Sequence, residues 1–223
     1  MTSPTGPAAP VADHHGVTVG FDLDMTLIDS RPGIAAVFRA LSAETGVFID
    51  ADAAVSRLGP PLEQELANWF PASATAEMAD RYRALYPDHA ITPTVLLPGV
   101  PESIEAIRAD GGRVLVITSK FAGNAALHLE HCGIVADVLV GWAYQDGKRD
   151  ALTGNGAHAY VGDFVADMTS ARAAGVTAIG VTTGPCGEAE LIAAGADVIL
   201  TDLREFPGWF ERSKLFGWAT RSR

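Results

Sequence analysis

Residues 17–30, VTVGFDLDMTLIDS, hold the pattern that decides the fold. An apolar, β-branched run leads directly into two carboxylates, Asp22 and Asp24, and then into a hydroxyl at Thr26. Such a run predicts a buried strand that ends in a loop. Open α/β sheets bind their ligands at strand ends of this kind. We therefore expect both carboxylates to point into one small volume, where a functional site begins.

Two like charges held this close need a physical reason, and chemistry offers two. A hard divalent cation such as Mg²⁺ is bound by carboxylate oxygens and keeps several waters and a substrate phosphate. Alternatively, one carboxylate acts as a nucleophile and the other as a general acid/base. A plain acidic turn or helix N-cap is the structural alternative, which the strand in front of the carboxylates disfavours.

Length and composition predict one α/β domain, or one domain with a modest insertion. The 223 residues are 48% hydrophobic, which is enough for a substantial core. No run approaches the ~18 apolar residues of a membrane span, and residues 1–16 lack the basic start and apolar centre of a signal peptide. Cys132 and Cys186 show no metal-ligand spacing. These features predict a cytoplasmic protein with reduced thiols and no membrane partner.

The net charge of −11 limits the choice of partner. It disfavours nucleic acid, and it also disfavours long-range attraction of an anionic ligand. The charge of a bound phosphate must therefore be met locally, by a metal and a few lysines. Lysines are scarce in this chain: Lys120, Lys148 and Lys214.

The rest of the chain divides into regions of different pattern. Residues 1–16, rich in Pro, Ala, Ser and Thr, have no periodicity and predict a disordered tail. Residues 30–96 predict helices and no strand. From residue 97 onward, helices alternate with strand candidates, and this alternation predicts a doubly wound, parallel, Rossmann-like α/β sheet. The strand candidates are residues 113–118, 138–141, 159–162, 178–181 and 198–200. Residues 213–223 are expected to form a C-terminal tail.

The pentapeptide DLDMT at residues 22–26 resembles motif I of the haloacid dehalogenase superfamily, whose phosphatases carry D-x-D-x-T or D-x-D-x-V after the first core strand. One class of these relatives inserts a small helical cap at that point. The resemblance implies a core formed by residues 17–29 and 97–212 and a cap formed by residues 30–96. The loop GPPL at residues 59–62 is similar to a G-x-P-L turn that relatives of the phosphoglycolate phosphatase-like branch point at the substrate. A plain connection between helices is the alternative for this loop.

Two later strand ends resemble further motifs of the same superfamily. Thr118, followed by Ser119, resembles motif II, in which a hydroxyl binds an oxygen of the transferring phosphoryl group. Asp163 and Asp167 resemble motif IV, G-D-x-x-x-D, and would lie on one face of a helix that begins at Asp163. The alternative for these aspartates is an N-cap and a solvated helix residue.

The lysine of motif III has two candidates in this chain. Lys148 lies 15 residues before Asp163, which is closer than in many relatives, and Lys120 is the alternate. A free surface lysine is the structural alternative for either of them.

The resemblance implies a Mg²⁺-dependent phosphatase that acts on a small phosphorylated metabolite, as a monomer or homodimer. Asp22 would attack phosphorus and form an aspartyl-phosphate. Asp24 would protonate the leaving alcohol and then activate the water that hydrolyses the intermediate. The groups implied to bind the transferring phosphoryl oxygens are Thr118, Ser119 and Lys148. The implied metal ligands are Asp22, the backbone carbonyl of Asp24, Asp163 and, in support, Asp167.

Two other functions stay open on the sequence. A sugar-phosphate mutase of β-phosphoglucomutase type shares every core motif and transfers the phosphoryl group to a sugar hydroxyl. A catalytically idle binding module could use the same fold. The complete set of carboxylates argues against the idle module, because clustered charge without a metal is costly to retain. The natural substrate depends on cap side chains that no general motif describes.

Overall fold

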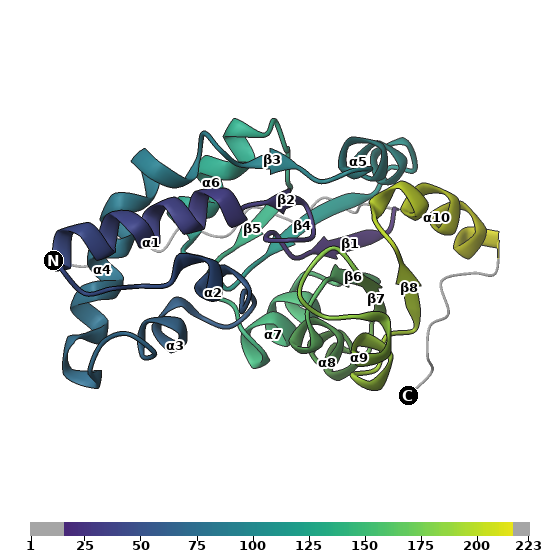
Figure 1. The fold of residues 1–223 in the computed structure, drawn as a ribbon. Helices are drawn as coiled ribbons and strands as arrows, with labels where there is room; N and C mark the ends of the chain where they lie inside the picture. The colour runs from purple at the N-terminus through teal and green to yellow at the C-terminus, as the bar shows by residue number, and fades with distance from the viewer. Residues whose placement is uncertain (1–15, 216–223) are drawn as a thin grey trace, which may run out of the picture.

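The structure is a computed structural model that describes residues 16–215 of the chain. Within these residues, six strands form one sheet in the order β5-β4-β1-β6-β7-β8, and every neighbouring pair is parallel. This sheet confirms the doubly wound, Rossmann-like fold predicted from the alternating pattern (Figure 1). Its strands are β1 (Thr18–Phe21), β4 (Arg113–Ile117), β5 (Val138–Val140), β6 (Ala159–Gly162), β7 (Thr177–Val181) and β8 (Val198–Leu200).

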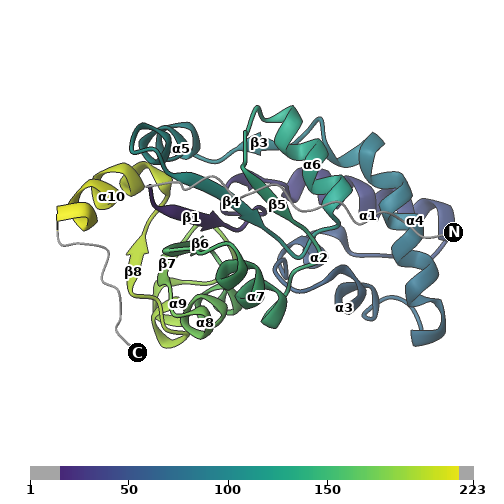
Figure 2. The same cartoon turned by 180° about the vertical axis from the view of Figure 1, so that it is seen from behind.

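Helices cover both faces of the sheet (Figure 1 and Figure 2). One face is covered by α5 (Val100–Ala109), α6 (Ala122–His131) and α10 (Phe206–Leu215), and the other by α7 (Asp146–Gly154), α8 (Val165–Ala174) and α9 (Glu188–Ala193). Strand β4 shows why both faces of the sheet must be covered. Its Val114 and Val116 pack in the apolar cluster on one face, and its Leu115 and Ile117 pack in the apolar cluster on the opposite face. A strand buried on both faces reads as a continuous apolar run.

The inserted helices have an apolar cluster of their own. They are α1 (Arg31–Thr45), α2 (Ala51–Val55), α3 (Leu62–Leu66) and α4 (Ala72–Ala90), and both views place them at one end of the sheet. Their buried side chains include Phe38, Leu41 and Tyr82. Gly33 lets α1 approach the end of α4 closely, since a Cβ there would lie 2.2 Å from the Ala90 carbonyl oxygen. This separate cluster supports the proposed division into core and cap.

Three local expectations from the sequence are wrong. Residues 30–96 do contain a strand, because β3 (Val95–Leu96) pairs antiparallel with β2 (Ile28–Asp29) where the chain leaves and re-enters the core. Helix α8 begins at Val165 and not at Asp163, because Phe164 has extended backbone angles. Helix α10 continues to Leu215, beyond residue 213 where a tail was expected. The remaining tail predictions concern residues 1–15 and 216–223, which lie outside the described residues.

The helices of residues 16–215 include none whose length and apolar content would let it cross a bilayer.

Candidate active site

The candidate site lies at the carboxyl ends of three adjacent strands. Strand β1 sits between β4 and β6, so the residues that follow these strands, Asp22, Thr118 and Asp163, emerge side by side. The backbone N–H of Asp22 still donates to the Val161 carbonyl of β6, at 2.8 Å. The sheet therefore fixes the start of the loop that carries both carboxylates.

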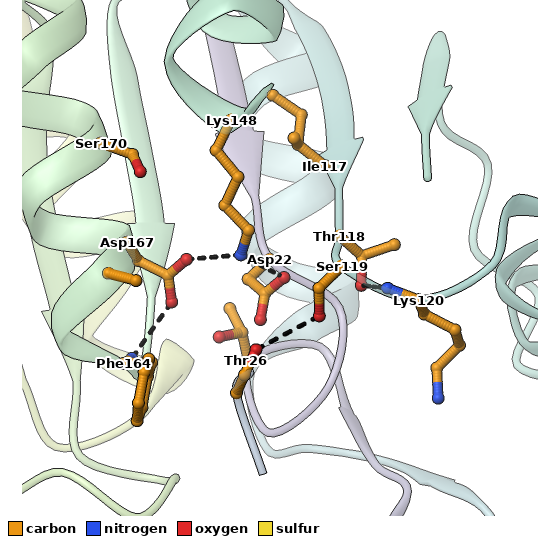
Figure 3. Close-up of polar contacts among 12 residues, drawn as sticks. Asp22, Thr26, Ile117, Thr118, Ser119, Lys120, Lys148, Phe164, Asp167 and Ser170 are labelled. Atoms are coloured by element: carbon orange, nitrogen blue, oxygen red, sulfur yellow. Dashed lines mark hydrogen bonds and ion pairs between the residues drawn. The ribbon is translucent and has the colours of Figure 1, made fainter. Parts of the chain in front are cut away.

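Lys148 lies between two of the carboxylates (Figure 3). Its Nζ is 2.9 Å from Asp22 Oδ1 and 2.5 Å from Asp167 Oδ1, and its side chain is only 4% exposed. Burial alone lowers the pKa of this lysine, but Asp167 and Asp22 together raise it well above its usual range. Lys148 belongs to helix α7, and its ammonium therefore stays charged beside Asp22.

Three buried aspartates form a cluster that suits a cation. One carboxylate oxygen each from Asp22, Asp163 and Asp167 lie within 4.8 Å of one another. Burial raises the pKa of Asp22 to about 7 although Lys148 opposes the change. Burial, together with Asp22 and Asp167, also raises the pKa of Asp163 well above its usual range. Burial is the main cause of both raised values, and the neighbouring carboxylates add to it. A bound cation would offset this cost, and carboxylate oxygens are ligands that Mg²⁺ prefers.

Local hydrogen bonds orient Asp163 and Asp167, two of the three aspartates in this cluster. Thr26 Oγ1 donates to Asp163 Oδ1 at 2.9 Å, and the backbone N–H of Phe164 donates to Asp167 Oδ2 at 3.1 Å. The side chain of Asp24 lies outside the cluster of three. The contribution of the Asp24 backbone carbonyl to the metal stays a prediction.

Asp24 has different partners from Asp22. Its Oδ1 accepts a short hydrogen bond from Ser30 Oγ and lies 3.0 Å from Lys120 Nζ. Burial would raise the pKa of Asp24, but Lys120 and the Ser30 hydroxyl outweigh it and hold the pKa below its usual range. The loop between the two carboxylates and Ser30 turns sharply at Met25, whose φ is 60°. Asp22 and Asp24, although only two residues apart, contact two different lysines, Lys148 and Lys120.

The motif II residues also reach the site from the end of β4. Thr118 is buried, and its Oγ1 accepts from the Lys120 backbone N–H at 3.2 Å. Ser119 Oγ donates to the Gly59 carbonyl oxygen at 3.3 Å. The structure thus brings the proline-containing loop of the inserted helices against the core beside Thr118.

A cavity of about 420 Å³ opens over the carboxylates. Core and inserted helices share its lining. The core contributes Asp22, Asp24, Ser119, Lys120, Asn124, Trp142 and Asp163, and the inserted region contributes Arg57, the loop at residues 58–61, Tyr82, Arg83 and Tyr86. Sequence reasoning missed Tyr86, Arg83 and Trp142 as lining residues, because no motif marks them and their positions depend on how the inserted helices dock.

Comparisons with known proteins agree with this geometry. The family described as haloacid dehalogenase-like hydrolase matches residues 19–181. "Probable phosphatase IndB" of Dickeya dadantii is 30% identical over 208 residues, which cover 84% of this chain and 90% of that protein. The phosphoglycolate phosphatase of Yersinia pseudotuberculosis is 30% identical over 188 residues, covering 74% and 81%. "Tyrosine-protein kinase PtkA" of Mycobacterium tuberculosis is 31% identical over 196 residues, covering 81% and 67%.

A solved structure shares the arrangement of most of the chain. The haloacid dehalogenase-like family protein SP0104 from Streptococcus pneumoniae superposes with a TM-score of 0.77 at 26% identity, covering 87% of this chain and 98% of that one. The sheet order, the carboxylates at its strand ends and these likenesses lead to one assignment. The chain belongs to the haloacid dehalogenase-like hydrolase family.

Proposed function

We propose that this protein is a Mg²⁺-dependent phosphatase that hydrolyses the phosphate ester of a small metabolite, as phosphoglycolate phosphatases do, through an aspartyl-phosphate on Asp22. One observation carries the proposal. Asp22 stands at the base of a cavity, with Lys148 at 2.9 Å and with two further buried carboxylates beside it. A nucleophile, a cation to neutralise phosphoryl oxygens and a set of metal ligands therefore meet at one point.

The residues present fit Mg²⁺. Asp22, Asp163 and Asp167 would hold it, because their oxygens converge and three buried carboxylates lie beside the one positive charge of Lys148. When bound, the ion supplies positive charge that screens the repulsion between an anionic nucleophile and an anionic phosphate.

Asp22 carries out the covalent step. Lys148 holds Asp22 Oδ1, which leaves the other carboxylate oxygen to attack phosphorus in line with the leaving group. The new bond joins this oxygen to phosphorus, and the ester P–O bond breaks. Lys148, Thr118 and Ser119 offer an ammonium and two hydroxyls to the phosphoryl oxygens as charge builds up on them.

Asp24 transfers protons to the leaving group and from the attacking water. In the first step Asp24, whose pKa rises when an anionic phosphate lies beside it, gives the proton of its carboxyl group to the departing alkoxide oxygen, so that an alcohol leaves. In the second step the resulting carboxylate takes a proton from the water that attacks the aspartyl-phosphate, and inorganic phosphate is released. General acid/base assistance of this kind contributes about 10² to 10⁴-fold.

The volume of the cavity bounds the substrate. About 420 Å³ is at the small end of ligand pockets and suits a metabolite-sized phosphate ester. We expect the protein to act on such a molecule as a monomer or homodimer, without a nucleic-acid or membrane partner.

Activity on a panel of phosphate esters, with and without Mg²⁺, tests the proposal. Asp22→Ala removes the nucleophile and Asp163→Ala removes a metal ligand, so both variants should fall to background while Asp150→Ala, an exposed aspartate on α7, keeps wild-type turnover. Turnover that EDTA does not diminish would exclude the metal role. Failure of the wild type on every ester would overturn the phosphatase proposal, and phosphoryl transfer to an added sugar phosphate would indicate a mutase instead.

A further inference from the structure

A chain of polar contacts leads away from Asp24 into the protein. Lys120 Nζ, 3.0 Å from Asp24 Oδ1, also donates a short hydrogen bond to the Tyr86 hydroxyl. The Tyr86 hydroxyl in turn lies 2.9 Å from His128 Nε2. The contacts therefore run from Asp24 through Lys120 and Tyr86 to His128.

This series of polar contacts joins parts of the protein that are distant in sequence. Lys120 follows strand β4, Tyr86 lies on the inserted helix α4, and His128 lies on the core helix α6. The hydroxyl of Tyr86 is thus the point at which an inserted helix touches the lysine beside Asp24.

Burial and packing hold each member in one position. The Lys120 side chain is 9% exposed, and its Nζ lies 4.6 Å from the centre of the Tyr86 ring, within the range of a cation–π contact. Tyr86 and His128 are fully buried, and their rings meet edge to face with centroids 5.5 Å apart. A lysine normally has many rotamers, so fixing its ammonium at two points removes most of that freedom before substrate arrives.

The proton positions in the chain follow from the donors available. A lysine ammonium can only donate, so the Tyr86 oxygen accepts from Lys120, which leaves the Tyr86 hydrogen available to His128 Nε2. The imidazole hydrogen is then on Nδ1, which is buried and has no hydrogen-bond partner among the described residues. A buried polar group without a hydrogen-bond partner destabilises a fold. The His128 imidazole therefore forms a hydrogen bond with Tyr86 through Nε2, while its Nδ1 has no hydrogen-bond partner among the described residues.

The two carboxylate oxygens of Asp24 have different surroundings. Ser30 and Lys120 both bind Oδ1, whereas Oδ2 has no hydrogen bond to any described residue, and Asp24 lines the cavity. One oxygen is thus held on the protein side, and the other is available to a leaving group or a water molecule.

We propose that Lys120 and Tyr86 are positioning residues for Asp24: Lys120, oriented by the Tyr86 hydroxyl with His128 behind it, holds one carboxylate oxygen so that the other faces the cavity for proton transfer. Lys120 and Lys148 thereby have separate tasks, since Lys148 contacts Asp22 and Lys120 contacts Asp24. This inference rests on the proposed phosphatase function, in which Asp24 moves the protons.

Rapid-quench kinetics with enzyme in excess over p-nitrophenyl phosphate test the proposal, because released phenol and released inorganic phosphate report different steps. Phenol release needs little help from an acid, since nitrophenolate is a good leaving group. Phosphate release needs Asp24 as base. Tyr86→Phe keeps the ring and removes the hydroxyl, so phenol release should stay within about twofold of wild type while phosphate release slows about tenfold, a fraction of the full general-base effect. Steady-state kcat on an alkyl phosphate should fall by a similar factor at unchanged KM.

The second variant, Lys120→Met, should show the same split with a larger loss of phosphate release. Because Tyr86 acts through Lys120, the double variant should be no slower than Lys120→Met alone, whereas independent contributions would add. His131→Leu, on the exposed side of α6, is the control and should match wild type.

Distinct outcomes overturn the inference. Equal slowing of phenol and phosphate release in Tyr86→Phe would indicate a general loss of structure. A rise in KM at unchanged kcat would make Tyr86 a substrate-binding residue, and additive losses in the double variant would separate it from Lys120. Wild-type enzyme that releases neither product would contradict the proposed function itself, before any variant is compared.

Discussion

Asp22 and Asp24 stand two residues apart, yet different neighbours set their acidity. Burial raises the pKa of Asp22 to about 7, and the nearby carboxylates add to the effect. Burial acts on Asp24 in the same direction, but Lys120 and Ser30 outweigh it and the pKa falls below its usual range. A cation bound by Asp22 would lower the pKa of that carboxyl, and an anionic phosphate beside Asp24 would raise its pKa, so ligand binding moves the two groups toward the ionised nucleophile and the proton donor of the proposed mechanism. Lys148 contacts Asp22 and Lys120 contacts Asp24, so each carboxylate has its own surroundings.

His128 allows a prediction on stability at the same scale. Burial first, and then Lys120 and His131, lower the pKa of His128, Asp24 opposes them, and the resulting pKa is about 4. Between about pH 6.5 and pH 4 the unfolded chain binds more protons at this residue than the folded protein does. The free energy of unfolding should therefore decrease as the pH falls through this window, by about 3 kcal/mol from His128 alone.

Urea unfolding at a series of pH values measures this contribution. His128→Asn should remove most of the decrease, seen as the difference from wild type, whereas His131→Asn, which changes an exposed histidine on the same helix, should keep it. Parallel pH curves for wild type and His128→Asn would contradict the prediction.

At the scale of helices and strands, predictability followed the strength of the local pattern. The core strands were predicted because parallel strands buried on both faces are continuous apolar runs, as in β4. Strands β2 and β3 were missed because two residues carry no period. The candidate carboxylates were found because each follows a strand. The contacts of Lys120 were not found, because its partner Tyr86 is 34 residues away on a helix whose docking no local pattern encodes.

The proline-containing loop and its neighbours give a prediction for the inserted helices. Arg57 lines the cavity and pairs with Glu65 through two hydrogen bonds of 2.9 and 2.6 Å, and Leu62 lies across the loop from it. Neither residue forms a hydrogen bond or ion pair with Asp22. Arg57→Ala or Leu62→Ala should therefore change the ratio of kcat/KM between natural phosphate esters more than it changes turnover of p-nitrophenyl phosphate.

The control for the loop prediction is Arg39→Ala. Arg39 is an exposed arginine of the same inserted region that pairs with Asp52 and does not line the cavity, so its loss should alter no substrate preference. An equal loss of kcat/KM on all substrates for Arg57→Ala and Leu62→Ala would indicate misfolding and would contradict a role of this loop in substrate selection.

At the scale of the whole molecule, the last described segment, residues 203–215, packs against helix α5. The short helix η1 (Leu203–Glu205) leads into α10 and packs on the beginning of α5. Ser103 Oγ donates to the Leu203 carbonyl oxygen at 3.0 Å, and α10 inserts Phe206 and Phe210 into the main apolar cluster. The last described segment is therefore part of the core.

Gly99 makes this packing possible and can be tested directly. Its φ is 87°, and a Cβ there would lie 2.1 Å from the Arg204 backbone nitrogen. Gly99→Ala should lower the free energy of unfolding by about 1–2 kcal/mol through the left-handed backbone and by about 1–3 kcal/mol more through the clash. Gly111→Ala, at a φ of 72° with nothing within 4 Å, should show only the first loss. Equal losses in urea unfolding would contradict the close approach of η1 to α5.

The central claim is that Asp22 carries the phosphoryl group and that Asp24 removes it with water. Asp24→Asn keeps the size of the side chain and removes the base, so the variant incubated with Mg²⁺ and p-nitrophenyl phosphate should accumulate phosphoenzyme. Mass spectrometry of the quenched and digested protein should find one phosphoryl group on the peptide that contains Asp22, and none in Asp22→Ala. Phosphate on another residue, or wild-type turnover by Asp24→Asn with no trapped phosphate, would contradict the claim.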